Sequence, residues 1–172
     1  IAKRALHTAL DAYRTQYNLH GICLVPTNSF GPGMSFDLDR SHTIPAIIRK
    51  VLEAKASGLE RIEAWGTGKP TRDFIYVSDL VDAMILAAER YDDAEPLNIG
   101  SGQEMSILGV VNLICKILDF HGEVVWNGDK PDGQPRRCLN ISRAKHYLNW
   151  EPKINLEEGI RLTAEWYKEQ IQ

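Results

Sequence analysis

Apolar residues recur every three or four positions along five stretches of the chain, a spacing that is typical of amphipathic helices. The predicted helices cover residues 2–17, 44–56, 78–90, 107–118 and 156–171. Each such helix has one apolar side. In the first and third helices that side consists of Ala5, Leu6, Leu10, Tyr13 and Tyr17, and of Leu80, Val81, Met84, Ile85 and Ala88.

The starts of three of these helices carry residues suited to capping. Ser78 or Asp79 can cap the third helix, and Ser106 can cap the fourth, because their side-chain oxygens accept from free N–H groups of the first turn. Asn155 and Glu158 have the spacing of a capping box ahead of the last helix.

Short apolar runs between the helices predict strands. The run 22–25 is continuously apolar, as in a strand buried on both faces, whereas residues 61–65 alternate like a half-buried strand. The other predicted strands are 74–77, 97–99 and 123–126. Residues 26–41 are rich in Gly and Pro and are expected to form a loop at the carboxyl end of the first strand, where ligands of open α/β sheets gather. The pattern predicts an α/β or α+β fold.

Composition limits the partners of this fold. The 172 residues are 44% apolar, with Lys+Arg 20 against Asp+Glu 23, so the formal net charge is −3. This apolar fraction excludes a disordered chain, and the near-neutral charge gives no field that would hold nucleic acid or an anionic membrane. No apolar run approaches the ~20 residues of a membrane span. An anion must therefore be held by a few local groups.

The cysteines and the first residues indicate location and extent. Cys23, Cys115 and Cys138 are odd in number and lack metal-binding spacing, so we expect free thiols, no metal site and a cytoplasmic protein. Residue 1 is Ile rather than Met, and residues 1–4 have the composition of a helix interior. We therefore expect the chain to be part of a longer protein.

No familiar phosphate-binding motif stands out. The Gly-rich turns 66–68 and 100–102 lack the spacing of a dinucleotide-binding loop, in which glycines let the backbone approach a pyrophosphate. A Walker motif, a zinc-ligand spacing and a nucleophile elbow are also missing from the sequence.

Five segments nevertheless resemble one family in order and along the whole chain. They are the Lys3 helix, 26–32 (PTNSFGP), 41–50 (SHTIPAIIRK), 65–80 (WGTGKPTRDFIYVSDL) and 130–137 (KPDGQPRR). Together they resemble the extended short-chain dehydrogenase/reductases, or NAD-dependent epimerase/dehydratases, that act on nucleotide sugars. Segments 41–46 and 130–136 resemble fewer members of the family than the others do. They favour the members that epimerise and reduce a GDP-4-keto-6-deoxy sugar.

The resemblance implies the carboxyl-terminal half of such an enzyme. Residues 1–30 would be the last helix and strand of the NAD(P)-binding Rossmann part. Residues 31–172 would be mainly the smaller α/β nucleotide-sugar-binding lobe, with returning Rossmann segments. The implied cofactor is NADP or NAD, and a homodimer through the first helix is expected.

The resemblance also assigns the catalytic and cofactor-side residues. Lys3 would lower the pKa of a tyrosine two residues before Ile1 and bind the nicotinamide ribose, and His42 would reprotonate the sugar after a cysteine outside this chain removes a proton. An imidazole suits this task because it exchanges protons near neutral pH. Lys3 and His42 are also expected at the cofactor, together with Pro26, Asn28 and Ser29. By residue type alone, Lys3 would be a solvated lysine and 26–29 an ordinary turn.

The expected substrate is a nucleotide-diphosphate sugar, with a GDP-sugar favoured. Lys50 and Arg72 would neutralise the phosphates, with Trp65 near the base; Lys keeps the charge of the usual Arg but loses its bidentate fork. Arg136 or Arg137 would reach the phosphates or the sugar, and spacing alone leaves a solvated surface pair as the other possibility.

The reaction itself stays open at this point. A nucleotide-sugar 4-epimerase or a dehydratase of the same superfamily is one alternative. A non-catalytic sugar-nucleotide-binding module is another, because the phosphate-binding turn and the catalytic phenol do not occur in these 172 residues.

Overall fold

The computed structural model describes residues 1–38 and 40–171 and has a mixed α/β fold, as the sequence predicts. The helices are α1 (Ala2–Tyr17), α2 (Thr43–Ala56), α3 (Val77–Arg90), α4 (Ile107–Ile117), α5 (Ser142–Leu148) and α6 (Leu156–Gln170). The strands are β1 (Leu24–Pro26), β2 (Asn28–Phe30), β3 (Arg61–Trp65), β4 (Thr71–Arg72), β5 (Phe74–Tyr76), β6 (Leu97–Ile99), β7 (Met105–Ser106), β8 (Glu123–Asn127) and β9 (Arg136–Arg137).

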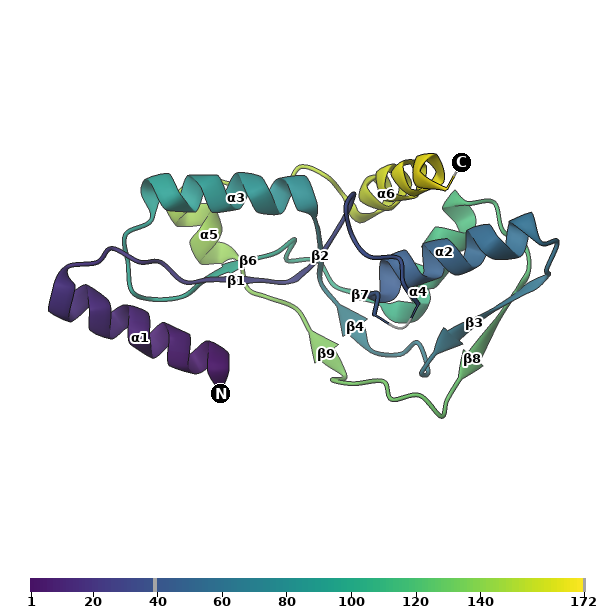
Figure 1. Ribbon diagram of the computed structural model, residues 1–172, viewed down its shortest axis with the longest axis horizontal. Helices are drawn as coiled ribbons and strands as arrows, with labels where there is room; N and C mark the ends of the chain where they lie inside the picture. The colour runs from purple at the N-terminus through teal and green to yellow at the C-terminus, as the bar shows by residue number, and fades with distance from the viewer. Residues whose placement is uncertain (39, 172) are drawn as a thin grey trace.

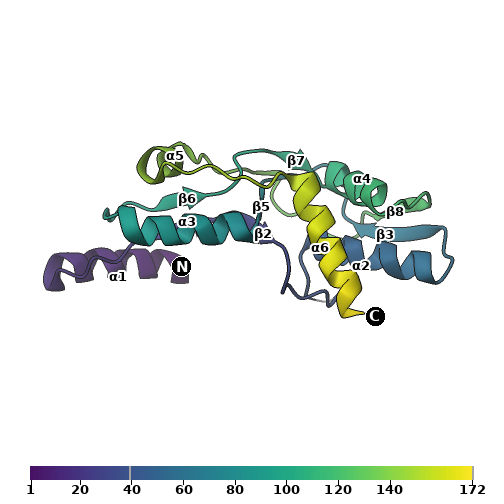
Figure 2. The same ribbon diagram turned by 90° about the horizontal axis from the view of Figure 1, so that it is seen from above.

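Most strand pairs are parallel. β1 pairs with β6, β2 with β5 and β3 with β8, and β4 lies between antiparallel β7 and parallel β9. Parallel neighbours need a long crossover connection, and here helices supply most of them. The helices gather at two ends: α1, α3 and α5 lie at one end of the molecule and α2, α4 and α6 at the other (Figure 1 and Figure 2).

Two hydrophobic cores correspond to these two ends. The lobe core lies among α2, α4, α6 and β3, and it includes Ile44, Ile48, Val51, Ile62, Val110, Val111, Ile114 and Ile160. The β6 core lies among β6, α3 and α5, and it consists of Ile75, Ala83, Ala87, Tyr91, Leu97, Ile99, Ala144, Leu148 and Trp150. The first two passages of the chain between the two ends run through β1–β2 and β5–α3 (Figure 1).

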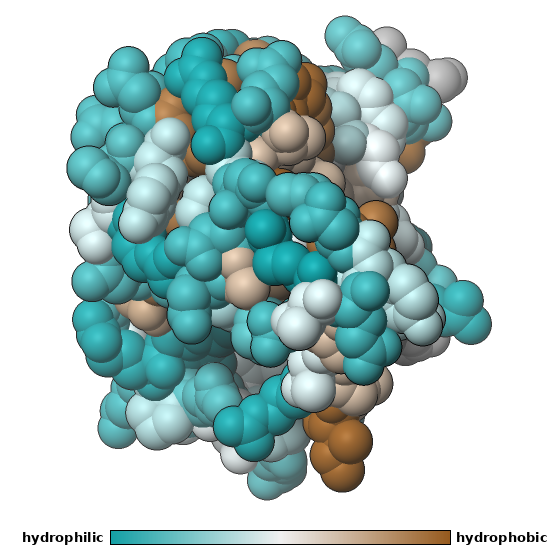
Figure 3. All heavy atoms as spheres, turned by 90° about the vertical axis from the view of Figure 1, so that its left-hand side faces the viewer, coloured by the Kyte–Doolittle hydropathy of each residue, from teal (hydrophilic) through white to brown (hydrophobic). Residues whose placement is uncertain are grey.

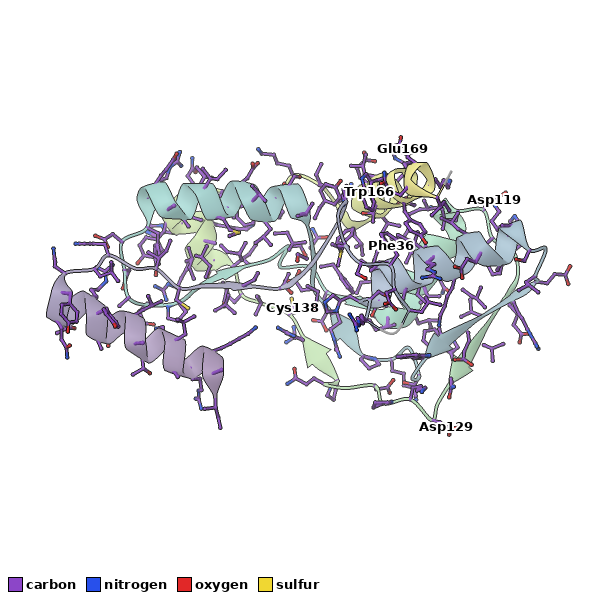
Figure 4. All side chains as sticks on the ribbon, in the orientation of Figure 1. Phe36, Asp119, Asp129, Cys138, Trp166 and Glu169 are labelled. Carbon is purple, nitrogen blue, oxygen red and sulfur yellow. The ribbon has the colours of Figure 1, made fainter. Side chains whose placement is uncertain are left out.

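The apolar face predicted for α2 is buried in the lobe core. Ile47 and Ile48 are 4% and 0% exposed, and Val51 is 0% exposed. Burying side chains of this size stabilises the fold by about 1.5–3 kcal/mol each. The segment before α2 is held against α6, since Phe36 stacks on Tyr167 with ring centroids 3.8 Å apart. Figure 4 shows Phe36 beside Trp166 on that side of the lobe.

Most of the large apolar residues predicted along α1 and α3 are exposed in the structure. Leu6 and Tyr17 on α1 are 60% and 69% exposed, and Met84 and Ile85 on α3 are 50% and 54% exposed. The contact of α3 with the β6 core is made by buried Ala83 and Ala87 and by partly buried Leu80 and Leu86. Figure 3 looks onto this end of the molecule and shows a mostly polar surface with separate apolar patches.

None of the residues of α1 is fully buried, and polar contacts tie this helix to the turn after α3. Arg14 and His20 both pair with Asp92 in the turn after α3, and the His7 ring lies 3.1 Å from the Ala94 carbonyl. Hydrogen bonds from Arg14 and His20 lower the pKa of the Asp92 carboxyl.

The predicted caps have mixed outcomes. Ser106 caps α4 by accepting from the Gly109 N–H at 3.0 Å, as expected. The cap predicted for α3 is wrong: this helix begins after Tyr76, and its Asp79 carboxylate accepts instead from the Ile154 N–H at 2.9 Å.

Only half of the capping box forms at α6. Asn155 accepts from the Glu158 N–H at 2.9 Å, but the Glu158 carboxylate binds Arg161 rather than returning to the cap.

Several short elements do not follow the predicted pattern. The predicted loop 26–41 is partly wrong, because β1 extends to Pro26 and β2 lies inside it. The two-residue strands β4, β7 and β9 and the short helix α5 were not predicted, since they are too short to show a period. Among the described residues, no helix is long and apolar enough to cross a membrane.

Candidate functional site

Two lysines flank an exposed tryptophan at the end of β3. Lys50 Nζ lies 5.5 Å and Lys130 Nζ 5.0 Å from the centroid of the Trp65 ring, and 52% of Trp65 is exposed. Lys50 Nζ also donates to the Glu63 carbonyl at 2.9 Å, which fixes its position. Cations next to an open aromatic face suit a ligand that combines a ring with negative charge.

A cavity of about 120 Å³ opens beside this cluster. Its lining includes Ser41, Thr43, Lys50 and Trp65. The Ser41 hydroxyl oxygen is buried and has no hydrogen-bond partner among the described residues. Buried polar atoms are nearly always hydrogen-bonded, so this hydroxyl is available to a ligand in the cavity.

Arg72 on β4 is held by main-chain carbonyls rather than by a carboxylate. Its Nη1 donates to the carbonyls of Thr71 and Gln134, each at 2.7 Å, and its Nη2 lies 3.4 Å from the Asp132 carbonyl. These contacts orient the guanidinium, and no carboxylate among the described residues forms an ion pair with it, although its charge helps to lower the pKa of the nearby Asp132 carboxyl. An oriented guanidinium without an ion-paired carboxylate suits a phosphate ligand.

The structure separates the two arginines of β9. Arg136 is ion-paired with Glu104 at 2.7 Å, and hydrogen bonds from Thr71 and Arg136 lower the pKa of the Glu104 carboxyl. Arg137 is exposed and has no side-chain partner among the described residues. Arg137 is therefore the one of the pair whose charge is open to a ligand.

A clasp joins the β3–β4 turn to the loop that carries Lys130. The Asp132 carboxylate accepts from the Thr67 N–H and the Thr67 hydroxyl, both at 2.6 Å, and these bonds lower the pKa of Asp132. Gly66 has φ +77°, and a Cβ on it would lie 2.3 Å from Asp132 Oδ1. Glycine at this position therefore allows both the turn and the clasp that brings Lys130 to Trp65.

The segment predicted to form the cofactor wall crosses from one end of the molecule to the other. Pro26 ends β1, and Ser29 pairs with Ile75 in the β2–β5 ladder. Asn28 Nδ2 donates to the Asp73 carbonyl at 2.8 Å. This segment is fixed by hydrogen bonds and stands at the carboxyl end of a parallel strand, where ligands of such sheets bind.

Lys3 and His42 are exposed and have no side-chain partner among the described residues. Lys3 lies near the start of α1, and His42 immediately precedes α2 without capping it through its side chain. The structure therefore brings together Lys50 and Trp65, and places Arg72 beside Arg137 in the β4–β9 ladder. No contact among the described residues joins Lys3 to His42 or to Asn28.

Sequence reasoning missed Asp73, which is 0% exposed at the centre of this region. Its carboxylate lies inside the 100–102 turn and accepts from the Ser101 N–H at 3.0 Å and the Ser101 hydroxyl at 2.5 Å. A Cβ on Gly100 would lie 2.6 Å from Asp73 Oδ2. The signal available in the sequence was a Gly-Ser-Gly turn that matches no phosphate loop, together with an aspartate directly before an apolar strand.

Short parallel strands joined by helices, with an open cation and aromatic cluster beside them, define an α/β protein with a site suited to an anionic, ring-bearing ligand. Residues 1–100 match the family model "NAD dependent epimerase/dehydratase family". The chain belongs to this family.

The curated relatives carry a more specific name. The chain is 40% identical over 171 residues to a "Probable GDP-L-fucose synthase 1" of Oryza sativa, covering 99% of this chain and 52% of the rice protein. It is 42% identical over 165 residues to a "GDP-L-fucose synthase" of Sinorhizobium fredii, covering 96% of this chain and 52% of that protein. The chain thus spans about half the length of these relatives.

Solved structures give the same picture of the fold. A UDP-glucose 4-epimerase of Thermotoga maritima, solved with UDP-glucose, is 29% identical with a TM-score of 0.90, covering 99% of this chain and 53% of that one. A GDP-L-fucose synthetase of Naegleria fowleri bound to NADP is 26% identical with a TM-score of 0.90, covering 99% and 55%. The extended short-chain dehydrogenase/reductase fold expected from the sequence is confirmed.

Proposed function

We propose that this chain is the nucleotide-sugar-binding, lysine-bearing half of an NADPH-dependent enzyme that epimerises and reduces a GDP-4-keto-6-deoxy sugar. The observation that carries the proposal is the Lys50–Trp65 cluster beside a small cavity. The comparison that supports the proposal is the sequence identity of about 40% between this chain and proteins named GDP-L-fucose synthase.

The nucleotide would bind along the line from Trp65 to β9. Trp65 offers its exposed ring to the base, and the buried Ser41 hydroxyl offers a hydrogen bond. Lys50, Arg72 and Arg137 would neutralise the diphosphate, and Arg136 would position β9 through Glu104. Excluding water around these cations strengthens each contact with the phosphates.

The residues present fit the nicotinamide end of NADP, with NAD as the alternative. The Lys3 ammonium, which has no partner among the described residues, suits a ribose hydroxyl. Pro26, Asn28 and Ser29 lie on a hydrogen-bonded segment that would form one wall, and His42 would also contribute to cofactor binding. The 100–102 turn is filled by Asp73 and does not suit the cofactor phosphates. When bound, the cofactor supplies the hydride.

His42 would carry the proton chemistry that this chain contributes. It is exposed ahead of α2, so solvent can renew its proton between turnovers. A positioned imidazole would return a proton to the sugar carbon during epimerisation, and Lys3 would stabilise an ionised phenol outside this chain.

In the intact protein, His42→Ala is expected to lower solvent-deuterium incorporation into the sugar by about 100-fold or more, the usual contribution of a general acid. Mass spectrometry of the recovered nucleotide sugar measures it. GDP affinity should stay within twofold, since His42 does not touch the Trp65 cluster. The matched control is His121→Ala, an exposed histidine paired with Asp119. Unchanged deuterium incorporation in His42→Ala would remove the acid role.

A nucleotide-sugar 4-epimerase is the second candidate, because the Thermotoga maritima epimerase superposes with a TM-score of 0.90. A dehydratase of the same superfamily is a further variant. The intact protein should oxidise NADPH with the GDP-4-keto sugar and leave UDP-glucose unchanged. Conversion of UDP-glucose to its 4-epimer without net cofactor oxidation would favour the epimerase. Nucleotide binding without any turnover would favour a non-catalytic module.

We also propose a homodimer through α1 and a reducing, cytoplasmic compartment. The exposed Leu6, Tyr13 and Tyr17 support the first, and three unpaired cysteines support the second. Light scattering of the intact protein should give twice the monomer mass, and substituting Tyr13 and Tyr17 by Ser should shift it toward monomer. A monomeric parent protein would remove the dimer proposal.

A further inference from the structure

We infer that Asp73 is a positioning residue that sets the distance between the cofactor wall and the phosphate-binding arginines. The inference rests on the proposed function. Asp73 directly follows Arg72 and lies between the Pro26–Ser29 segment, the 100–102 turn and the β9 segment, each of which it contacts. It is fully buried and pairs with no Lys or Arg side chain among the described residues.

Asp73 thus lies at a junction of three segments: Pro26–Ser29, the 100–102 turn and the β9 segment. Its carboxylate binds the side formed by the 100–102 turn. It accepts from the Ser101 N–H at 3.0 Å, the Ser101 hydroxyl at 2.5 Å and the Gly102 N–H at 3.3 Å, and the Leu139 N–H lies 3.5 Å away. The turn that failed to match a phosphate loop is therefore an anion-binding turn whose anion is supplied by the protein itself.

The main chain of Asp73 holds the other side. Its N–H donates to the Arg137 carbonyl at 3.0 Å. Its carbonyl accepts from the Thr27 hydroxyl at 2.9 Å and from Asn28 Nδ2 at 2.8 Å. One residue therefore fixes Asn28 of the proposed cofactor wall and Arg137 of the proposed phosphate site, with the Arg72 side chain starting from the adjacent position.

A carboxylate is specifically suited to this place. Every group that contacts it is a donor, and an ionised Asp is an acceptor at both oxygens. An amide in the same volume would turn an N–H₂ group toward backbone N–H groups, so Asp73→Asn is expected to move the turn or the strand. A shift of 1 Å between reacting groups can cost about 100-fold in rate.

Asp79 provides a matched control. It is also buried, at 1% exposed, and its carboxylate accepts from a backbone N–H, that of Ile154. Among the described residues, its carboxylate makes no hydrogen bond to the cofactor wall or to β9. Asp79→Asn therefore repeats the chemical change at equal burial without disturbing the proposed junction.

The test compares both variants in the intact protein. Asp73→Asn is expected to lower kcat by about 10- to 100-fold, with the KM values for NADPH and the GDP-sugar within threefold. The deuterium isotope effect from NADPH labelled at the transferred hydrogen should rise, because misaligned hydride transfer becomes rate-limiting. Asp79→Asn should leave kcat and the isotope effect unchanged. A fall in activity that only follows the folded fraction, with no change in isotope effect, would overturn the inference.

Hydrogen exchange tests the junction without using activity. In Asp73→Asn, residues 26–30 and 136–140 should lose protection together with 100–103, whereas Asp79→Asn should loosen 152–156. Loosening confined to 100–103 would overturn the inference. If Asp73→Asn does not fold, Ser101→Ala removes the 2.5 Å bond, along with the contacts of the Ser101 hydroxyl to Gln103, and should give the same pattern more weakly. A parent protein without turnover would refute the proposed function but leave this exchange result valid.

Discussion

The two ends of the molecule use the same kind of helix in opposite ways. α2 and α1 are both amphipathic and similar in length, yet α2 has six buried residues and α1 has none. The α2 face is covered by α4, α6 and β3, whereas α1 is held through the polar contacts of its own His7 and Arg14 and of His20 just after it. Amphipathic spacing therefore predicts an apolar face that packs against another surface, but it does not identify that surface.

The largest expected effect separates the two ends directly. Ile48→Ala should lower the free energy of unfolding by about 2–5 kcal/mol, because it leaves a cavity in the lobe core. Leu6→Ala should change it by no more than ~0.5 kcal/mol in the monomeric protein, because the side chain is already exposed. Chemical denaturation of both variants measures the difference. A loss in the free energy of unfolding for Leu6→Ala as large as that for Ile48→Ala would show that the apolar face of α1 is buried against another surface.

A smaller effect is expected from the helix caps. Ser106→Ala should destabilise the lobe end by about 1 kcal/mol, since the Gly109 N–H loses its partner at the start of α4. Ser142→Ala is the control at the other end, where Ile141 stands at the cap and the Ser142 side chain is exposed. Denaturation midpoints at constant m-value measure both. Equal losses would mean that the Ser106 cap contributes nothing specific.

The smallest effect is expected from acidification. The pKa values of Asp132 and Asp92 are lowered in the folded protein, so their contribution is present above the usual aspartate pKa of 3.8 and is lost as pH falls through the lower folded value. NMR titration should show the Thr67 amide changing at the clasp while the lobe core stays folded. Arg14 and His20 should change at the same time, with α1 detaching. Retention of α1 at pH 2 would show that it has an apolar contact.

The sequence predicted the long elements well and the short ones poorly. α1, α2, α4 and α6 show a clear helical period, and their predicted bounds agree with the structure to within about one residue. β4, β7 and β9 have two residues each, and their pairing depends on partners more than 30 positions away. Such strands exist because of tertiary contacts, so no local pattern could reveal them.

The candidate site shows a similar limit. The sequence singled out Lys50 and Trp65, which the structure brings together, but it could not tell Arg136 from Arg137, because only the fold places Glu104 beside the first. Asp73 was missed because its partners come from three distant segments. The roles of Lys3 and His42 stay predictions, since neither side chain has a partner among the described residues.

The stack of Phe36 on Tyr167 divides the connection between β2 and α2 into two shorter spans. Loop-closure entropy grows only with the logarithm of length, by about 0.6 kcal/mol for each doubling. Extra residues between Pro32 and Gly33, which are both exposed, would therefore lengthen only the first span and leave the approach to His42 anchored. This point is a natural place to insert a label or a short peptide, and also a place where related chains can differ in length without altering the site.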